Sequence, residues 1–246
     1  MSSTTRLCMR LTAAAGFAGM FTQGAIASAG GSLADRSVAG PPRAVVELFT
    51  SQGCSSCPPA DAVVGRLSGN PAVLVLSFHV NYWDDLGWKD PFSSVLSTDR
   101  QYAYARSLNE RSVFTPQLIV NGMESLVGSQ EGKVQKAVAA ASETSFPVQA
   151  ELSEQTDGRF SLTLTGAAVS ADVWEVRYVR HTVTPVRGGE NGGRTLETFN
   201  DVTQLHHIGA FRAGTFTLEP LKKPDDGIAV FVQGPGTGRI WGAAAH

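Results

Sequence analysis

The sequence predicts an α/β domain over residues 43–145, followed by a small all-β, sandwich-like domain over residues 146–246. Two observations lead to this fold class. Up to residue 142, apolar runs of strand length alternate with segments whose apolar residues recur at helical spacing. After Phe146, short alternating runs are separated by turns and no helical pattern is present, which is typical of a β-sandwich.

Residues 1–29 have the three parts of a secretory signal peptide. Arg6 and Arg10 come before any acidic residue, an apolar run follows over residues 11–21, and the small residues 27–29 (ASA) match a cleavage site. We therefore expect cleavage after residue 29 and a periplasmic or secreted protein with no stable membrane span. A retained N-terminal anchor is the alternative.

The charge pattern and the cysteines limit the function further. The formal net charge is −2, and Lys and Arg are scattered rather than clustered. Because nucleic-acid binding requires a basic patch, no nucleic-acid partner is expected. After signal cleavage, Cys54 and Cys57 are the two cysteines that remain. In an oxidising compartment they can pair only with each other.

The first elements of the α/β domain follow from local patterns. Residues 44–49 (AVVELF) and 72–80 (AVLVLSFHV) are apolar runs of strand length. Between them, over residues 60–67, apolar residues at i, i+3, i+4 and i+7 predict a helix that starts just after Cys57. Residues 98–101 (TDRQ) match a capping box and predict the start of a second helix.

The last elements of the α/β domain are a hairpin and a helix. Residues 114–122 (FTPQLIVNG) predict a strand that turns through Asn121-Gly122 into another strand. A final helix follows over residues 129–141, with its apolar residues on one face. The order is strand, Cys-x-x-Cys, helix, strand, helix, hairpin, helix.

This order of elements resembles the thioredoxin fold. Cys54 and Cys57 stand at a strand-to-helix turn, and Thr115-Pro116 immediately precedes the strand of the hairpin. The chain is also similar to a bacterial family of secreted thioredoxin-like proteins, the domain-of-unknown-function family 1223, in the stretches ELFTSQGCSSCPPAD, HVNYWDDLGWKDPFSS, FTPQLIVNG and GENGGRTLETFNDV. The resemblance implies a thioredoxin-like α/β domain and an exported protein, but no substrate.

Thiol–disulfide exchange is the chemistry that best suits the two cysteines. It needs one thiolate that attacks and a second thiol that resolves the mixed disulfide. We expect Cys54 to be exposed at the helix N-terminus, where N–H groups lower a thiol pKa, and Cys57 to be the more buried resolving thiol. A structural zinc site needs four ligands, and no second pair of cysteines is present.

Four further residues are candidates for roles at this site. Glu47 lies in an apolar strand, so we expect it to be buried and to move the proton of Cys57; a residue facing water at the sheet edge is the alternative. Thr115 and Pro116, joined by a bond that we predict to be cis, would form the edge that binds an extended substrate segment. Trp83 would line a cleft beside Cys54, or simply cover the sheet.

The predicted function is therefore a thiol–disulfide oxidoreductase that needs no cofactor or metal. Its partners would be a protein or small-molecule thiol or disulfide and a redox protein that recycles the cysteines. Two other classes stay open. In a copper(I) metallochaperone, Cys54, Cys57 and His79 would hold the ion, because soft thiolates suit it. In a non-catalytic binding module, the β-domain would be the contact surface.

Overall fold

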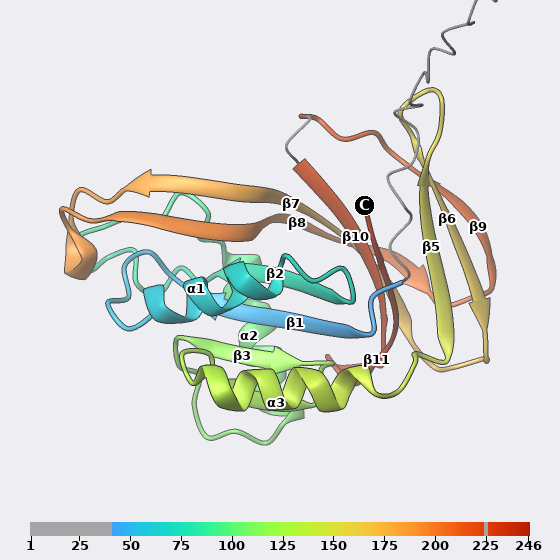
Figure 1. The fold of residues 1–246 in the computed structure, drawn as a ribbon, viewed down its shortest axis with the longest axis horizontal. Coiled ribbons are helices and arrows are strands. Elements are labelled where there is room, and N and C mark those ends of the chain that lie inside the picture. The colour runs from blue at the N-terminus through green and yellow to red at the C-terminus, as the bar shows by residue number, and fades with distance from the viewer. Residues whose placement is uncertain (1–40, 224–225) are drawn as a thin grey trace, which may run out of the picture. The chain divides into compact units, whose positions relative to one another are not determined.

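The computed structural model describes residues 41–223 and 226–246, so the predicted signal peptide lies outside the described residues. The strands form an eight-stranded sheet in the order β11-β10-β7-β8-β2-β1-β3-β4 and a three-stranded sheet in the order β5-β6-β9 (Figure 1). Within the described ranges, no helix is both long and apolar enough to cross a membrane. The elements are β1 (Ala44–Thr50), α1 (Pro58–Leu67), β2 (Val73–His79), α2 (Val95–Ser107), β3 (Gln117–Val120), β4 (Glu124–Val127), α3 (Glu131–Ser142), β5 (Val148–Glu154), β6 (Phe160–Gly166), β7 (Asp172–Pro185), the 3-10 helix η1 (Gly189–Asn191), β8 (Thr195–Ala210), β9 (Gly214–Leu218), β10 (Asp226–Gln233) and β11 (Ile240–Ala245).

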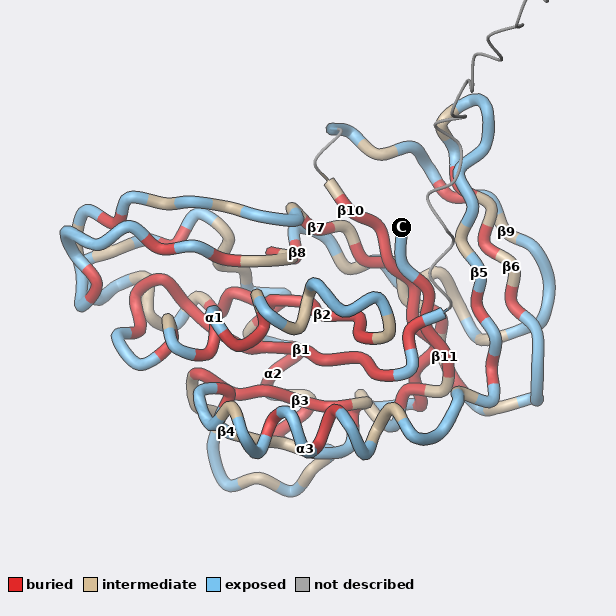
Figure 2. Tube along the Cα trace, viewed as in Figure 1, coloured by how far each residue is buried: buried red, intermediate tan, exposed pale blue. Residues whose placement is uncertain are grey.

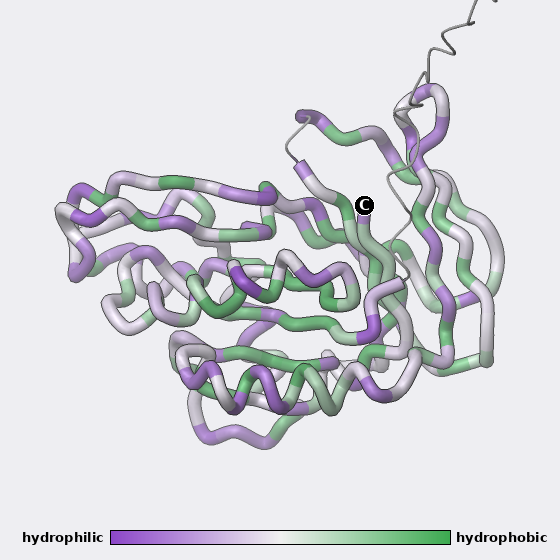
Figure 3. Tube along the Cα trace, in the orientation of Figure 1, coloured by the Kyte–Doolittle hydropathy of each residue, from purple (hydrophilic) through white to green (hydrophobic). Residues whose placement is uncertain are grey.

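The central strands β1 and β2 run parallel and are buried along their whole length (Figure 2). Because side chains alternate across a strand, β1 serves two cores. Val46 and Leu48 face α1 and α3 on one side of the sheet. Val45 and Phe49 face the other side, where Tyr104 of α2 joins the core. Burial on both faces explains why β1 is mostly hydrophobic (Figure 3).

A narrow seam joins β2 to β8 inside the large sheet. The two strands run parallel there and pair through Ser77 and Asp201 alone. Side chains strengthen the seam: the Ser77 hydroxyl donates to the carbonyl of Phe199 at 2.7 Å, and the Asn200 amide donates to the carbonyl of Val75 at 2.8 Å. This seam brings a segment from the C-terminal half of the chain beside the strand that ends at His79.

The predicted fold class, an α/β thioredoxin-like domain followed by a small all-β domain, is wrong. Strands make up 43% of the described structure and helices 19%. Strands β7, β8, β10 and β11, from the segment assigned to a separate β-domain, continue the sheet of β1 to β4. The physical reason lies at β2: a buried strand with an open edge would leave its backbone groups unpaired, and β8 covers part of that edge.

The three-stranded sheet packs against the same large sheet. Phe160, Leu162 and Leu164 of β6 are fully buried against Ile228 and Val230 of β10. The alternating pattern after Phe146 correctly indicates strands that bury one face. Hydrophobic periodicity, however, does not say which sheet a strand joins.

Two local predictions have different outcomes. Asn121 and Gly122 both have positive φ, 49° and 71°, and they join the antiparallel strands β3 and β4 as expected. The capping box at residues 98–101 is wrong, because α2 begins at Val95. Its N-cap is Ser94, whose hydroxyl accepts the Ser97 N–H at 3.1 Å.

Candidate functional site

Cys54 and Cys57 form a disulfide immediately before α1. Their Cα atoms lie 5.5 Å apart. Cys57 is the N-cap residue of the helix, and the two prolines that follow occupy its first positions, where the backbone has no intrahelical N–H bond to lose. The predicted location of the pair, at a strand-to-helix turn, is therefore confirmed.

The predicted difference in exposure between the two cysteines is wrong. Cys54 and Cys57 are both 0% exposed. Cys54 is covered by segments far away in the sequence, since its sulfur contacts the Thr115 hydroxyl and its carbonyl accepts a bond from Asn191. A reagent in solution therefore cannot reach either sulfur without movement of a neighbouring segment.

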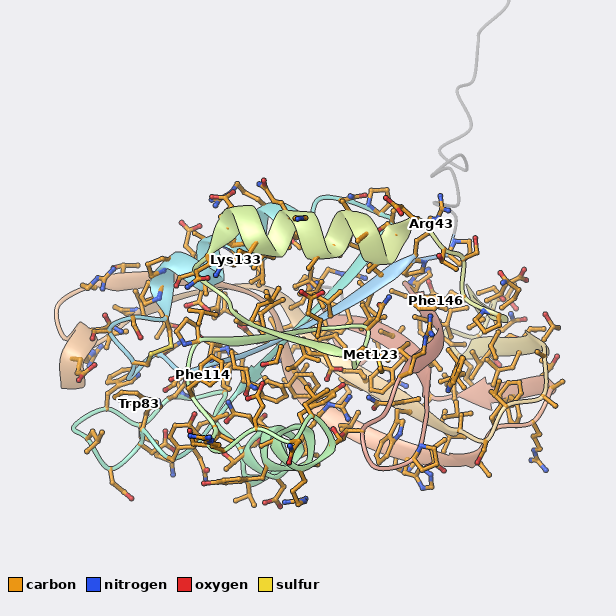
Figure 4. The ribbon with its side chains drawn as sticks, turned by 90° about the horizontal axis from the view of Figure 1, so that it is seen from below. Arg43, Trp83, Phe114, Met123, Lys133 and Phe146 are labelled. Atoms are coloured by element: carbon orange, nitrogen blue, oxygen red, sulfur yellow. A yellow bond between two sulfur atoms is a disulfide. The ribbon has the colours of Figure 1, made fainter. Side chains whose placement is uncertain are left out.

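Trp83 and Thr115 come together at Cys54 in a chain of hydrogen bonds. The indole N–H of Trp83 donates to the Thr115 hydroxyl at 2.9 Å, and that hydroxyl donates to the Cys54 sulfur at 3.3 Å. Because the Trp83 bond occupies an acceptor site of the hydroxyl, the Thr115 proton points toward the sulfur. Figure 4 shows Trp83 beside Phe114, the neighbour of Thr115. The same arrangement favours negative charge on Cys54.

Ser56 and Pro116 complete this side of the disulfide. The Ser56 hydroxyl lies 3.3 Å from the Cys54 sulfur and donates to the carbonyl of Thr115 at 3.4 Å. Pro116 is buried next to Thr115, and the bond between them is cis, as predicted. The three predicted substrate-binding residues, Thr115, Pro116 and Trp83, are thus gathered at one place.

Glu47 is buried, as expected, but its carboxylate points into a different cluster. Arg100 of α2 donates to both of its oxygens, from Nε and from Nη2, the latter at 3.0 Å. Tyr104 also donates to the Glu47 carboxylate. None of the hydrogen bonds recorded for this carboxylate reaches Cys54 or Cys57. The proposed proton transfer by Glu47 therefore has no contact in the described residues to support it.

The surroundings of Arg100 favour its charged form. Burial acts to lower the pKa of Arg100, but Glu47 and Tyr104 together outweigh burial through their charges and hydrogen bonds, and the net shift is upward. Arg100 Nη2 also donates to the Gln233 side chain at 2.9 Å. The guanidinium lies over three aromatic rings, those of Phe78, Tyr104 and Phe231, at 5.0 to 5.4 Å from their centroids.

A second buried acid, which the sequence reading missed, lies on the helix that follows the disulfide. Asp61 is on α1, four residues after Cys57, so the two residues share one face of the helix. The Thr50 hydroxyl donates to its carboxyl group at 2.9 Å. Burial raises the pKa of Asp61 to about 7, against the opposing effects of His79 and of the Thr50 bond. Asp61 can therefore exchange a proton near neutral pH.

His79 lies between two buried carboxylates. Its Nδ1 is 2.7 Å from Asp90, and its Nε2 is 3.0 Å from Asp201 of β8. Burial acts to lower the pKa of His79, but the two carboxylates hold it well above its ordinary value, so both nitrogens donate. Burial likewise acts to raise the pKa of Asp90, and His79 reverses that shift.

These bonds bear on the copper alternative. Both ring nitrogens of His79 are engaged with carboxylates, and Cys54 is bonded to Cys57. Within residues 41–223 and 226–246, no group of three or more His, Cys, Asp or Glu side chains is arranged to hold a metal ion. The described site therefore offers copper(I) no ready set of ligands.

The tip of the β7–β8 hairpin is a further part of the site that the sequence reading did not identify. Asn191 donates from its side-chain amide to the carbonyls of Gln52 and Cys54, at 3.0 and 2.9 Å. Glu190 accepts the N–H of Ser55 at 3.0 Å. The signal for this contact was the glycine-rich stretch GENGG at residues 189–193, because glycines permit close approach of two backbones.

Comparisons with known proteins agree on a family and a fold. The model of a family described as a protein of unknown function (DUF1223) matches residues 45–233. A crystal structure of an Agrobacterium tumefaciens protein is 27% identical, with a TM-score of 0.70, over 83% of this chain and 94% of that one. HBP35 of Porphyromonas gingivalis shares the fold at 15% identity, with a TM-score of 0.56, over 84% of this chain and 75% of that one. No curated protein matches the chain.

Proposed function

The chain belongs to the DUF1223 family of proteins of unknown function, and we propose from the surroundings of its disulfide that it is a thiol–disulfide oxidoreductase. The observation that carries the proposal is the pairing of a disulfide with a buried acid of suitable pKa. Cys57 and Asp61 lie one helical turn apart, and the pKa of Asp61 is about 7. A disulfide that only staples a fold needs no such acid, and a loop this short stabilises little.

The reaction begins with attack on Cys54. A partner thiolate forms a bond to the Cys54 sulfur, the Cys54–Cys57 bond breaks, and the electron pair goes to Cys57. A second thiolate of the partner then attacks the partner sulfur that is bonded to Cys54. This attack forms the partner disulfide and releases Cys54 as a thiolate. The partner is oxidised to a disulfide by two electrons, and the cysteine pair is reduced. In the reverse order, the same steps reduce a partner disulfide.

Two features favour Cys54 as the sulfur that reacts with the partner. The Thr115 hydroxyl donates to Cys54, and the Ser56 hydroxyl lies at the same distance, 3.3 Å. The Thr115 hydroxyl stabilises a thiolate that leaves or attacks at this position, and the Ser56 hydroxyl can do so once it turns away from the Thr115 carbonyl. The carbonyl of Thr115 lies at the same spot and can bind an N–H of an extended partner segment once Ser56 releases it.

Asp61 serves Cys57 in this scheme. When the disulfide breaks, negative charge develops on a fully buried sulfur, which is costly unless a proton arrives. Asp61 carries a proton at and below about pH 7 and lies on the same face of α1. It is thus suited to protonate Cys57 during reduction and to take that proton back during oxidation.

Trapping of mixed disulfides tests the proposal. In a Cys57→Ser variant the thiol that would resolve the intermediate is gone. The Cys54 thiolate should therefore attack disulfide partners, release one partner sulfur as a thiolate and accumulate as the mixed disulfide. The matched Cys54→Ser variant should accumulate few. Mass spectrometry of the adducts identifies the sulfur involved. Equal trapping by both variants, or trapping at Cys57 alone, would contradict the roles assigned here.

We also propose that the protein is exported to the periplasm or beyond, where a redox partner recycles the cysteine pair. The support is the signal-peptide pattern of residues 1–29 and the oxidised state of Cys54 and Cys57. N-terminal sequencing of the protein recovered from the producing cells should start at Gly30. A membrane-bound protein that still starts at Met1 would indicate an anchor instead.

A further inference from the structure

The tip of the β7–β8 hairpin is fastened to the turn that holds the disulfide. Figure 1 shows the long hairpin ending beside the segment that precedes α1. Asn191 donates to two carbonyls of this turn, those of Gln52 and Cys54, and Glu190 accepts the N–H of Ser55. Three residues of the turn, Gln52, Cys54 and Ser55, are thus held from outside by two adjacent side chains.

Asn191 is oriented for this task. It is fully buried, and its amide oxygen accepts a bond from Arg194 at 2.6 Å. Because the oxygen is engaged with Arg194, the NH₂ group faces the turn and uses both of its hydrogens there. A side chain with every polar group satisfied in a buried site holds its position firmly.

Glycines let the tip approach its other neighbour, the loop of residues 81–94. A Cβ atom built on Gly188 would lie 2.3 Å from the carbonyl oxygen of Gly87. The φ of Gly188 is −160°, an extended conformation that any residue adopts. Glycine is therefore required at position 188 for space alone. A methyl group there would push the tip away from the loop while leaving Glu190 and Asn191 unchanged.

Two side chains occupy backbone groups that a polypeptide partner could bind. Glu190 takes the N–H of Ser55, and Ser56 takes the carbonyl of Thr115. An extended peptide has carbonyl and N–H groups that can replace both bonds, as in strand addition. A small thiol has neither group in the right place. Displacing the side chains therefore costs a peptide less than it costs a small thiol.

We propose that the hairpin tip, residues 188–191, is the specificity-determining element of this site: it keeps the disulfide turn closed to small thiols and yields to thiols carried on an extended polypeptide. The inference rests on the proposed function, because it assigns the class of partner. The tip must move away from the disulfide turn before a thiol attacks Cys54. The hydrogen bonds of Glu190 and Asn191 to the turn oppose this movement. The substrate class is a protein thiol or disulfide in an extended segment.

Two probes with the same thiol chemistry test this selection. One is N-acetylcysteine amide, and the other is an extended hexapeptide with one internal cysteine. Each reduces the disulfide by the same steps: one thiolate bonds to the Cys54 sulfur, Cys57 takes the electron pair, and a second probe molecule releases Cys54 as the probe disulfide forms. Alkylation of the freed thiols, followed by mass spectrometry, gives the rates.

The oxidised wild-type protein should react about tenfold faster with the peptide than with the small thiol, as expected for one or two replaced hydrogen bonds. In Glu190→Ala, Asn191→Ala and Gly188→Ala, the small thiol should gain about tenfold, so the ratio falls toward one. The matched control is Gly132→Ala on α3, where the added Cβ meets nothing within 4 Å. It should keep the wild-type ratio.

Two results would overturn the inference: equal rates for both probes in the wild-type protein, or an unchanged ratio in Glu190→Ala and Gly188→Ala. Glu190 is exposed, so its variant tests the idea even if Asn191→Ala does not fold. Any disulfide undergoes this chemical reduction, whether or not the protein is an enzyme. Failure of the Cys57→Ser trapping would count against the proposed function alone, and an unchanged ratio would count against the tip alone.

Discussion

The protein has two buried charged clusters on neighbouring central strands, and they differ in their balance of charge. The first joins Glu47 of β1 to Arg100 and Tyr104 of α2. The second joins Asp61 of α1, His79 of β2 and two further aspartates, Asp90 and Asp201. Both clusters are nearly free of solvent. Burial alone therefore does not distinguish a structural acid from one that can move a proton.

The first cluster has one acid and one base. Glu47 and Arg100 neutralise each other in a geometry with two parallel bonds, and Arg100 also stacks on aromatic rings. Burial, together with the charge of Glu47, holds the pKa of Tyr104 well above its ordinary value, so its hydroxyl remains a donor. Arg100 and Tyr104, whose pKa values are both raised, keep their protons at neutral pH, and their bonds to Glu47 join α2 to β1.

The second cluster has three acids and one base. His79 as an imidazolium can neutralise only one of the carboxylates around it, and Asp90 and Asp201 both bind its nitrogens directly. Asp61 is the member without a bond to His79, and it is the one whose pKa is raised to about 7. Burial is the main cause of the raised pKa of Asp61, and the charges of Asp201 and Asp90 add to it. In the proposed reaction, this proton would go to Cys57.

The largest effect is expected from breaking the balanced pair. Arg100→Met leaves the Glu47 charge buried without a partner and removes the stacking on three rings. The free energy of unfolding should fall by about 5 kcal/mol, the upper end for a buried ion pair. Denaturant titration of the oxidised protein measures it.

The control for this prediction is the double variant Glu47→Leu with Arg100→Met. It removes both charges and should recover most of the loss, because no buried charge remains unpaired. If the free energy of unfolding falls by the same amount in the single and the double variant, the pair stabilises the fold through packing rather than through charge.

A smaller and pH-dependent effect is expected in the unbalanced cluster. The folded pKa of Asp61, about 7, exceeds its ordinary value of 3.8. Between these two pH values the folded state holds a proton that the unfolded state has lost, so stability falls as pH rises through this window. The total fall from this group is up to about 4 kcal/mol. Asp61→Asn should remove it, so the variant should be more stable than wild type at pH 8.

Denaturant titrations at pH 4, 6 and 8 check the sign and the window. Asparagine keeps an acceptor for Thr50, which makes the substitution nearly isosteric. Arg100→Met serves as the comparison, because its loss should change little across the same pH range. If wild-type stability does not fall between pH 4 and pH 8 relative to Asp61→Asn, the folded pKa of Asp61 is not raised and its proposed role is removed.

The sequence identified part of the site for sound local reasons. Cys54 and Cys57 could pair only with each other, and prolines after Cys57 suit the first turn of a helix. Glu47 was correctly expected to be buried, since the residues on both sides of it are apolar. Its partner Arg100 could not be inferred, because it is 53 positions away in the sequence and the contact forms only when α2 packs on β1.

For Asp61, the sequence shows the position but not the burial. Asp61 stands four residues after Cys57, and an acid in the first turn of a helix is usually a solvent-exposed partner of the helix dipole. Its burial arises only when α1 packs on the sheet, and burial raises its pKa. The contact of β8 with β2 brings Asp201 to His79, and it places strands from both halves of the chain in one sheet.

The sequence by itself determined the elements that depend on near neighbours: the disulfide turn before α1, the Asn121-Gly122 hairpin, the buried central strands, and the alternating strands after Phe146. Tertiary structure alone decided which strands share a sheet, which acid is paired and which is left to titrate, and what covers Cys54. The reason is physical. Backbone propensity and side-chain periodicity act over a few residues, whereas burial, charge balance and edge pairing depend on segments that meet only in the folded chain.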